Sequence, residues 1–116
     1  MLQPVFTTSF QKDVKRVEKR GYDMEKLKEV IKLILLNQRP LPPKYKDHPL
    51  RGKWQPKWEL HIEPDWLLIY QISGEQCFFA RTGTHADLFS LESIAKRMIK
   101  YLLFARSHEI WQREIL

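Results

Sequence analysis

The sequence predicts an α+β fold in which helices cover one face of an antiparallel sheet of about four strands. A strand-like segment is followed by two amphipathic helical segments, then by three consecutive strand-like segments, and a third amphipathic segment closes the chain. Runs of helices and strands kept apart in this way favour α+β over an alternating α/β fold. With 116 residues, 43% of them hydrophobic, the chain has room for one core and needs neither a disulfide nor a metal to fold.

The N-terminal third predicts a strand and a helical hairpin. Residues 3–8 are expected to form the strand, because they include β-branched residues and a proline suited to an edge. A helix over 10–20 follows, with Ser9 as its N-cap, and Asp23 caps a second helix over 24–37. Apolar residues recur three or four positions apart in both segments, so each helix has one face to bury.

Residues 39–57 predict an ordered but irregular loop. The segment is rich in proline and carries six basic residues, so it has few backbone donors and a positive charge. A short strand near 48–50 is expected within it. Trp54 and Trp58 either stack RNA bases or close the core. The basic side chains expected to contact RNA phosphates are Lys46, Arg51 and Lys53.

The second half of the chain predicts an antiparallel meander. Residues 58–63, 65–72 and 76–82 read as strands, and Gly74 lies in the tight turn between the last two. A third amphipathic helix is predicted over 91–104, with apolar residues along one side.

Composition narrows the functional classes. The net charge of +6 suits a polyanionic partner such as RNA, although it also suits solubility alone. The single cysteine, Cys77, excludes a disulfide framework and a cysteine-rich zinc site. No apolar run reaches the length of a membrane span, and the N-terminus does not read as a signal peptide. We therefore expect a cytoplasmic protein with no membrane partner.

Polar side chains cluster on the strand predicted over 58–63. His61 and Glu63 alternate onto its polar face, Asp65 follows directly, and Glu59 is assigned to the other face. One imidazole and two carboxylates suit Mn²⁺ or Mg²⁺, so a metal centre is one interpretation. Metal-free acid–base chemistry is the second, and a solvated strand face is the third.

The acid–base interpretation depends on three of the histidines. His48, His61 and His85 all fall in or beside the loop and the sheet. Because an imidazole titrates near pH 6.5, one ring can take the proton of a ribose 2′-hydroxyl while another protonates the departing 5′-oxygen. Arg81 would stabilise the added negative charge of the transition state. This chemistry cleaves RNA without a metal and spares DNA, which lacks the nucleophile.

Three stretches resemble the YafQ family, a branch of the RelE-like toxins of bacterial type II toxin–antitoxin systems. They are 41–52 with Asp-His-Pro-Leu, 58–70 with His-Ile-Glu-Pro-Asp-Trp, and 81–89 with Arg-Thr-Gly-Thr-His-Ala-Asp-Leu-Phe. The resemblance implies a RelE-like microbial RNase fold for 1–89 and makes 90–116 a C-terminal helical extension.

The resemblance also implies a function. It predicts a ribosome-dependent mRNA endonuclease that needs no metal or other cofactor, with the ribosome and mRNA as partners. It predicts a cognate antitoxin, often of the ribbon–helix–helix type, through which alone operator DNA is bound. The residues that match the family's catalytic positions are His48, His61, Asp65 and His85, and those that match its RNA-contacting positions are Trp66 and Phe89.

Two other functions stay open at this point. The same superfamily fold also carries ParE-like toxins, which poison DNA gyrase by binding and need no hydrolytic site. A non-catalytic RNA or ribosome binder would use the basic loop alone. The grouping of histidines argues against the first of these, and the second stays open.

Overall fold

The computed structural model describes residues 1–89. Its first compact unit spans Met1–His85, and Ala86 begins the second. The helix predicted over 91–104, and with it the extension 90–116, lies outside the described residues. Among the helices of the described part, none is long and apolar enough to cross a bilayer.

The sheet has five strands in the order β1-β5-β4-β3-β2. The strands β3 (Trp58–Glu63), β4 (Trp66–Ser73) and β5 (Gln76–Gly83) form the predicted antiparallel meander. A short β2 (His48–Pro49) pairs antiparallel with β3, and β1 (Gln3–Phe6) pairs parallel with β5. The parallel edge was not predicted. Parallel pairing needs a long connection between the two strands, and the chain after β1 continues into two helices and makes no hairpin turn.

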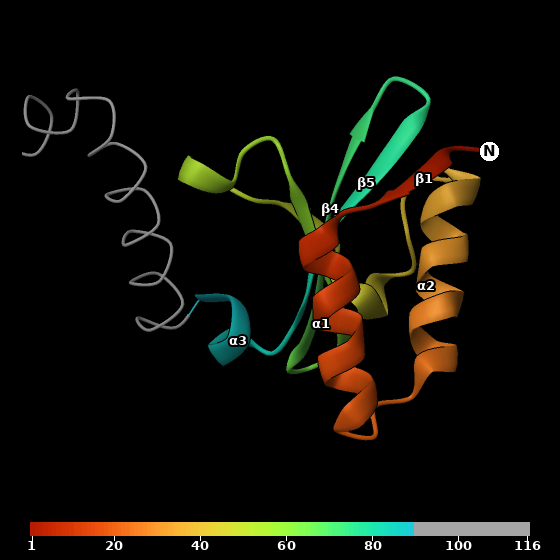
Figure 1. Cartoon of the computed structure of the whole chain (residues 1–116). Helices are drawn as coiled ribbons and strands as arrows, with labels where there is room; N and C mark the ends of the chain where they lie inside the picture. The colour runs from red at the N-terminus through yellow and green to blue at the C-terminus, as the bar shows by residue number, and fades with distance from the viewer. Residues whose placement is uncertain (90–116) are drawn as a thin grey trace, which may run out of the picture. The chain divides into compact units, whose positions relative to one another are not determined.

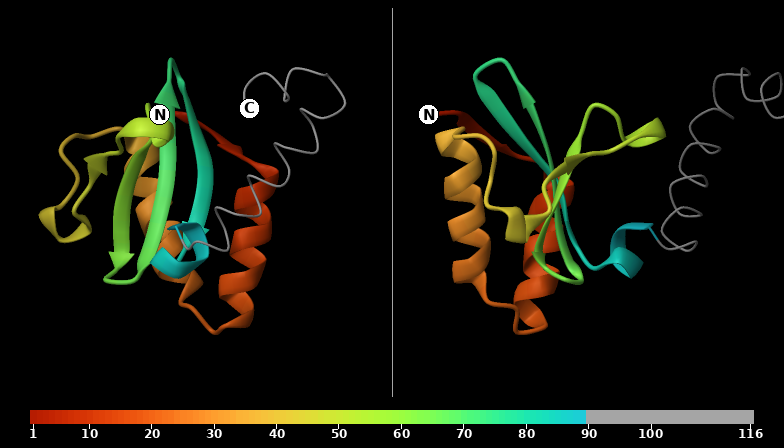
Figure 2. Two further views of the ribbon diagram at one scale, coloured as in Figure 1. Left: turned by 90° about the vertical axis from the view of Figure 1, so that its left-hand side faces the viewer. Right: turned by 180° about the vertical axis from the view of Figure 1, so that it is seen from behind.

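Two helices lie on the same face of this sheet (Figures 1 and 2). They are α1 (Thr8–Lys19) and α2 (Met24–Leu36). Asp23 caps α2 as predicted, its side chain accepting from the backbone N–H of Glu25 at 3.0 Å.

The N-cap of α1 is Thr7, and the prediction of Ser9 is wrong. The Thr7 hydroxyl oxygen accepts from the backbone N–H of Phe10 at 3.1 Å, and the same hydroxyl donates to the carbonyl of Phe79 at 2.9 Å. Both residue types cap helices well. The second bond, to a strand that is distant in sequence, distinguishes Thr7 from Ser9.

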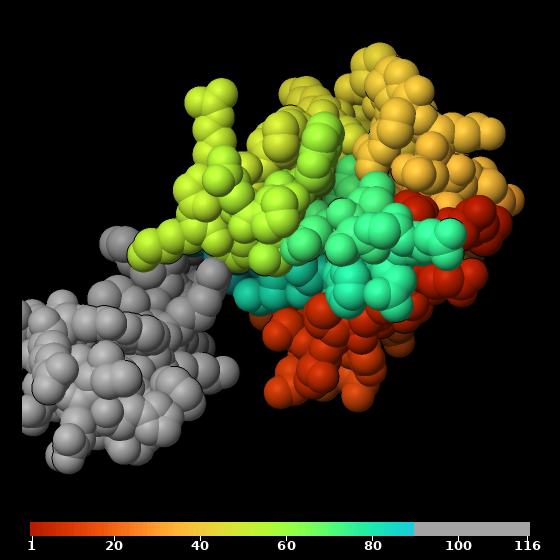
Figure 3. All heavy atoms as spheres, turned by 90° about the horizontal axis from the view of Figure 1, so that it is seen from above, coloured from red at the N-terminus to blue at the C-terminus, as the bar shows by residue number. Residues whose placement is uncertain are grey.

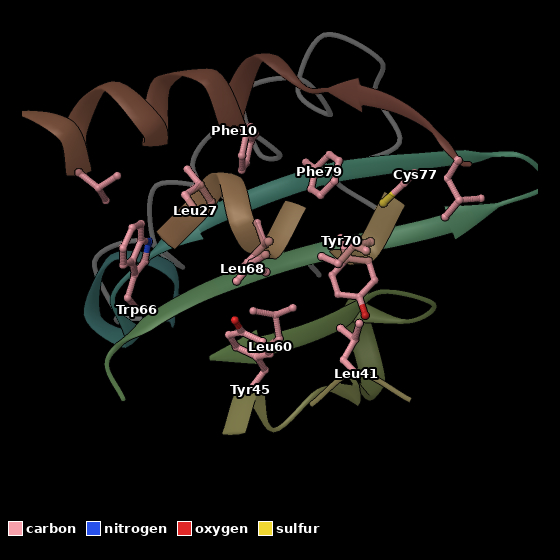
Figure 4. Close-up of a cluster of buried hydrophobic side chains, with 14 residues drawn as sticks. Phe10, Leu27, Leu41, Tyr45, Leu60, Trp66, Leu68, Tyr70, Cys77 and Phe79 are labelled. Carbon is pink, nitrogen blue, oxygen red and sulfur yellow. The ribbon is translucent and has the colours of Figure 1, made fainter. Parts of the chain in front are cut away.

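The core lies between the two helices and the sheet (Figure 4). In β4, alternate residues Trp66, Leu68 and Tyr70 face it, as the period of two predicts. The helices contribute Phe10, Val17, Leu27, Val30 and Ile34, and β3 and β5 contribute Leu60, Cys77 and Phe79.

The predicted loop over 39–57 is ordered around two short 3₁₀ turns, η1 (Pro43–Tyr45) and η2 (Gly52–Trp54). Leu41 and Tyr45 anchor it, because both side chains are buried in the core. Figure 3 shows this loop, yellow to yellow-green, beside the green hairpin of β4 and β5. The basic loop is therefore fixed along the β2 and β3 edge of the sheet.

Candidate active site

Three histidines from separate elements meet at one end of β3. His48 is in β2, His61 is in β3, and His85 begins α3 (His85–Phe89). The centre of the His61 ring lies 6.2 Å from that of His48 and 5.7 Å from that of His85. His61 is thus the middle member of a row of three imidazoles.

Asp65 fixes the orientation of His85. Its Oδ1 lies 2.6 Å from His85 Nδ1 and accepts from the His85 backbone N–H at 2.9 Å. Because an ionised carboxylate only accepts, the contact places a proton on Nδ1. The other ring nitrogen, Nε2, is then the atom that can exchange a proton with a substrate.

Glu59 holds His48 from the opposite strand. The two residues are directly paired between β2 and β3, and His48 Nε2 lies 3.0 Å from Glu59 Oε2. His48 Nδ1 lies 2.6 Å from the carbonyl oxygen of Lys46. Both ring nitrogens therefore face acceptors within the protein. Glu59 and the Lys46 carbonyl together fix the orientation of the His48 ring.

The assignment of Glu59 to the opposite face of β3 is wrong. Residues 59 and 61 are two positions apart, so the period of a strand puts both on the same face. That spacing is the signal that would have identified Glu59. Its side chain is buried, and its Oε1 has no hydrogen-bond partner among residues 1–89. A buried carboxylate beside an imidazole is costly unless the pair is kept together.

Glu63 turns away from the histidines. Its Oε1 lies 2.6 Å from Lys26 Nζ on α2, and the carboxylate raises the pKa of that lysine. The register between β3 and β4 shifts between His61 and Glu63, which interrupts the alternation assumed from the sequence. Glu63 therefore does not join His61 and Asp65 in the predicted cluster. Within residues 1–89, no three His, Cys, Asp or Glu side chains are placed to hold a metal ion.

A groove of about 360 Å³ opens beside His61. Three lysines line it, Lys26 from α2 and Lys44 and Lys46 from the basic loop. The structure therefore places Lys46 next to the histidine row. Arg51 and Lys53, the other predicted phosphate contacts, are exposed at η2.

Arg81 is bound by a buried carboxylate of α1. Its Nε donates to Asp13 Oδ2 at 2.6 Å and its Nη2 donates to Asp13 Oδ1 at 3.1 Å. Asp13 Oδ2 also accepts from the backbone N–H of Thr82 at 3.1 Å. The guanidinium thus ties the end of β5 to α1, and its role toward a transition state stays a prediction.

Trp66 is a core residue. Its side chain is 1% exposed, its Nε1 donates to Thr82 Oγ1 at 2.9 Å, and its ring packs edge-on against Tyr22. The burial gives Trp66 a structural role, and its predicted contact with RNA stays a prediction. The same alternation that places Leu68 in the core places Trp66 there. Phe89 ends α3, and its predicted contact with RNA stays a prediction.

Cys77 is unsuited to act as a nucleophile. It is buried in β5, and burial raises the pKa of its thiol to about 12. At neutral pH the thiol therefore stays protonated, and a thiol is a much weaker nucleophile than a thiolate.

Comparison with known proteins identifies relatives of this arrangement. The sequence model of the family described as "Bacterial toxin of type II toxin-antitoxin system, YafQ" matches residues 2–90. The mRNA interferase toxin YafQ of Escherichia coli (strain K12) is 49% identical over 84 residues, which cover 72% of this chain and 91% of that protein.

Solved structures show the same likeness. YafQ in the crystal structure of the E. coli DinJ-YafQ complex has a TM-score of 0.72 and 46% identity, covering 77% of this chain and 99% of that one. A metal-bound toxin from Helicobacter pylori has a TM-score of 0.72 and 42% identity, covering 77% of this chain and 100% of that one. From the match to the family's sequence model and the identity to its E. coli member, this chain belongs to the YafQ family of type II toxin–antitoxin toxins.

Proposed function

We propose that this chain is an endoribonuclease toxin that cuts mRNA on the ribosome by attack of a ribose 2′-hydroxyl on the adjacent phosphate. The observation that carries the proposal is the row of three imidazoles, in which Asp65 orients His85 at 2.6 Å. In the groove beside His61, Lys26 is paired with Glu63, and Lys44 and Lys46 of the basic loop supply positive charge for the RNA backbone. The E. coli relative is named an mRNA interferase.

The histidines divide the chemistry between them. The 2′-oxygen forms a bond to phosphorus as it loses its proton to one imidazole, and the bond from phosphorus to the 5′-oxygen breaks as another imidazole protonates that oxygen. His61 and His85 carry these two proton transfers through Nε2, since Nδ1 is the engaged nitrogen in each ring. His61 Nδ1 lies 3.4 Å from the carbonyl oxygen of Pro64, and His85 Nδ1 lies 2.6 Å from Asp65 Oδ1. His48 is held beside His61 by Glu59 and the Lys46 carbonyl.

The cut leaves a 2′,3′-cyclic phosphate and a 5′-hydroxyl. No metal takes part in either proton transfer. Hydrolysis by a metal-bound water leaves different ends, because water and not the 2′-oxygen is then the nucleophile. The ends of the product therefore distinguish the two chemistries even in a ribosome preparation that contains Mg²⁺.

The partners follow from family membership. The E. coli relative has been crystallised with DinJ, and we propose that a cognate antitoxin, of the ribbon–helix–helix type, likewise holds this chain inactive. Operator DNA is then bound through that complex and not by the toxin alone. The net charge of +6 favours both an acidic antitoxin surface and ribosomal RNA.

The test is cleavage of a defined mRNA by the purified chain, with and without ribosomes. We expect cuts only in translated mRNA, cyclic phosphate ends, and loss of each cut when the nucleotide before it carries a 2′-deoxyribose. His85→Ala should lower turnover by roughly 10²-fold or more, the usual contribution of one acid or base. Cuts that survive the deoxy substitution, or that end in a 3′-hydroxyl, would overturn the proposed chemistry.

The matched control is Lys12→Ala, which changes an exposed residue of α1 away from the histidines. It should cut as the unchanged chain does. Arrest of growth by His85→Ala to the same extent as by the unchanged chain, with mRNA intact, would favour the gyrase-binding alternative.

A further inference from the structure

A second surface hollow, of about 760 Å³, is lined by the basic loop and shares Lys46 with the lysine-lined groove. Prolines of the loop form much of its wall. Arg39 and Lys46 add positively charged groups to the lining, and Trp58 adds an aromatic ring. The Trp58 side chain is 37% exposed, although large apolar side chains of the described chain are mostly buried. A partly exposed indole that lines a hollow is a candidate for ligand contact.

The wall that carries Trp58 is held in place before any ligand arrives. The Arg39 guanidinium lies 5.5 Å from the ring centres of both Trp58 and Tyr70. Arg39 Nη1 contacts Asp47 at 2.5 Å and donates to the Tyr70 hydroxyl at 2.9 Å. The Tyr70 hydroxyl in turn donates to Asp47 at 2.5 Å, and burial raises the pKa of this phenol, so it remains a donor.

The apolar part of the hollow is equally fixed. Leu41 is anchored in the core beside Tyr70, whose hydroxyl points toward it in Figure 4. The proline rings have restricted backbone angles and lose little freedom when a ligand binds. A rigid site of this kind costs little to occupy, because few side chains need to be ordered.

The side chains that line the hollow suit the flat ring of an unpaired nucleobase. An indole and a guanidinium present π faces that stack on any nucleobase. Asp47 is already paired with Arg39, so Lys46 is left to contact a phosphate. The volume lies within the range of sites that enclose small ligands. A helix of a partner protein would more typically need an elongated apolar groove.

Lys46 connects this hollow to the histidines. It lines both the hollow and the groove that contains His61. Trp58 precedes His61 by three positions in β3, so the two side chains leave the strand on opposite faces, and the contact between the hollow and the groove runs through Lys46 at the β2 edge. An RNA strand that crosses this edge over Lys46 therefore reaches both Trp58 and the histidines.

We propose that this hollow, which we call the Trp58 pocket, holds the unpaired base of a nucleotide flanking the bond that is cut. The proposal rests on the proposed nuclease function. It adds a binding subsite in which Trp58 stacks on the base and Lys46 contacts the backbone.

The experiment uses ribosomes carrying a defined mRNA in which single bases on either side of the cut are removed one at a time. With the unchanged chain, we expect one flanking position at which the missing base lowers kcat/KM roughly tenfold, in line with the contribution of one stacked base. Trp58→Ala should show the same loss on intact mRNA and no further loss at that position. Trp58→Phe, which keeps an aromatic face, should restore most of the rate.

The control is Trp54→Ala, which changes a tryptophan of η2 in the basic loop that does not line the pocket. It should retain sensitivity to the missing base. If Trp58→Ala cuts intact mRNA as fast as the unchanged chain, the Trp58 pocket is not an RNA subsite, while the nuclease proposal stands. If it instead weakens only the antitoxin complex, the pocket belongs to the protein partner, and the proposal is overturned. If the unchanged chain does not cut, both proposals fail.

Discussion

Asp65 accepts from both the ring and the backbone of His85, at 2.6 Å and 2.9 Å. One carboxylate oxygen therefore sets the tautomer of the imidazole and the position of the residue that carries it. Asp65 lies in the turn between β3 and β4, whereas His85 follows β5. The pair therefore depends on the antiparallel meander, which brings these two strand ends together.

Asp65→Asn should retain the fold and lose turnover. The amide oxygen can still accept from the backbone N–H, but without its charge it holds the Nδ1 proton less strongly. We expect kcat to fall by roughly 10-fold to 10²-fold with little change in KM, measured on translated mRNA. Glu75→Gln, an exposed change at the β4–β5 turn, is the control. An equal effect of both variants would refute an orienting role for Asp65.

Glu59→Gln tests whether the buried carboxylate acts on His48. The amide keeps the size of the side chain but removes the charge that faces His48 Nε2 at 3.0 Å. We expect kcat to fall about tenfold with KM little changed, since His48 then loses the carboxylate that holds its ring. Glu18→Gln on α1 should change neither. Turnover by Glu59→Gln at the rate of the unchanged chain would show that Glu59 does not act on His48.

Asp13→Ala should destabilise the fold strongly. The change removes both acceptors of Arg81 and the acceptor of the Thr82 backbone N–H, and leaves a partly buried guanidinium without its partner. Breaking a buried ion pair from one side costs about 3–5 kcal/mol. Urea unfolding measures the loss, with Lys12→Ala as the control. A loss below about 1 kcal/mol would mean that the Asp13–Arg81 pair does not hold β5 to α1.

Trp66→Phe separates the core role of this residue from the predicted RNA contact. The phenyl ring cannot donate to Thr82 Oγ1, and it fills less of the core than the indole does. We expect a loss of about 2 kcal/mol in the free energy of unfolding, with kcat/KM nearly unchanged at a temperature where both proteins are folded. A large loss of kcat/KM with full stability would support the predicted contact of Trp66 with RNA.

Cys77 should react slowly with alkylating reagents. Burial raises the pKa of its thiol from the ordinary 9.0 to about 12, so the folded protein keeps a proton that the unfolded chain releases. This group therefore contributes stability below pH 9 that is lost as the pH rises toward 12. Iodoacetamide at pH 8 should label the chain only in urea, as read by mass spectrometry. Fast labelling of the folded chain would show that β5 opens.

The sequence by itself determined the elements of this fold that depend on local patterns. Helix caps such as Asp23, the period of two in β4 and the turn at Gly74 are read within a few residues, and the structure has each of them. The histidines were grouped by their positions in the loop and the sheet and by the resemblance to one family, and the structure places the His61 ring about 6 Å from each of the other two.

Only the tertiary structure decided which distant side chains meet. Strand pairing placed Glu59 opposite His48, a register shift turned Glu63 toward Lys26, and α1 placed Asp13 against Arg81. Each contact joins residues on different elements, and its geometry depends on how those elements pack. A pattern of period 2 or 3.6 specifies the face of the strand or helix on which a residue lies. It does not specify which residue of another element contacts that face.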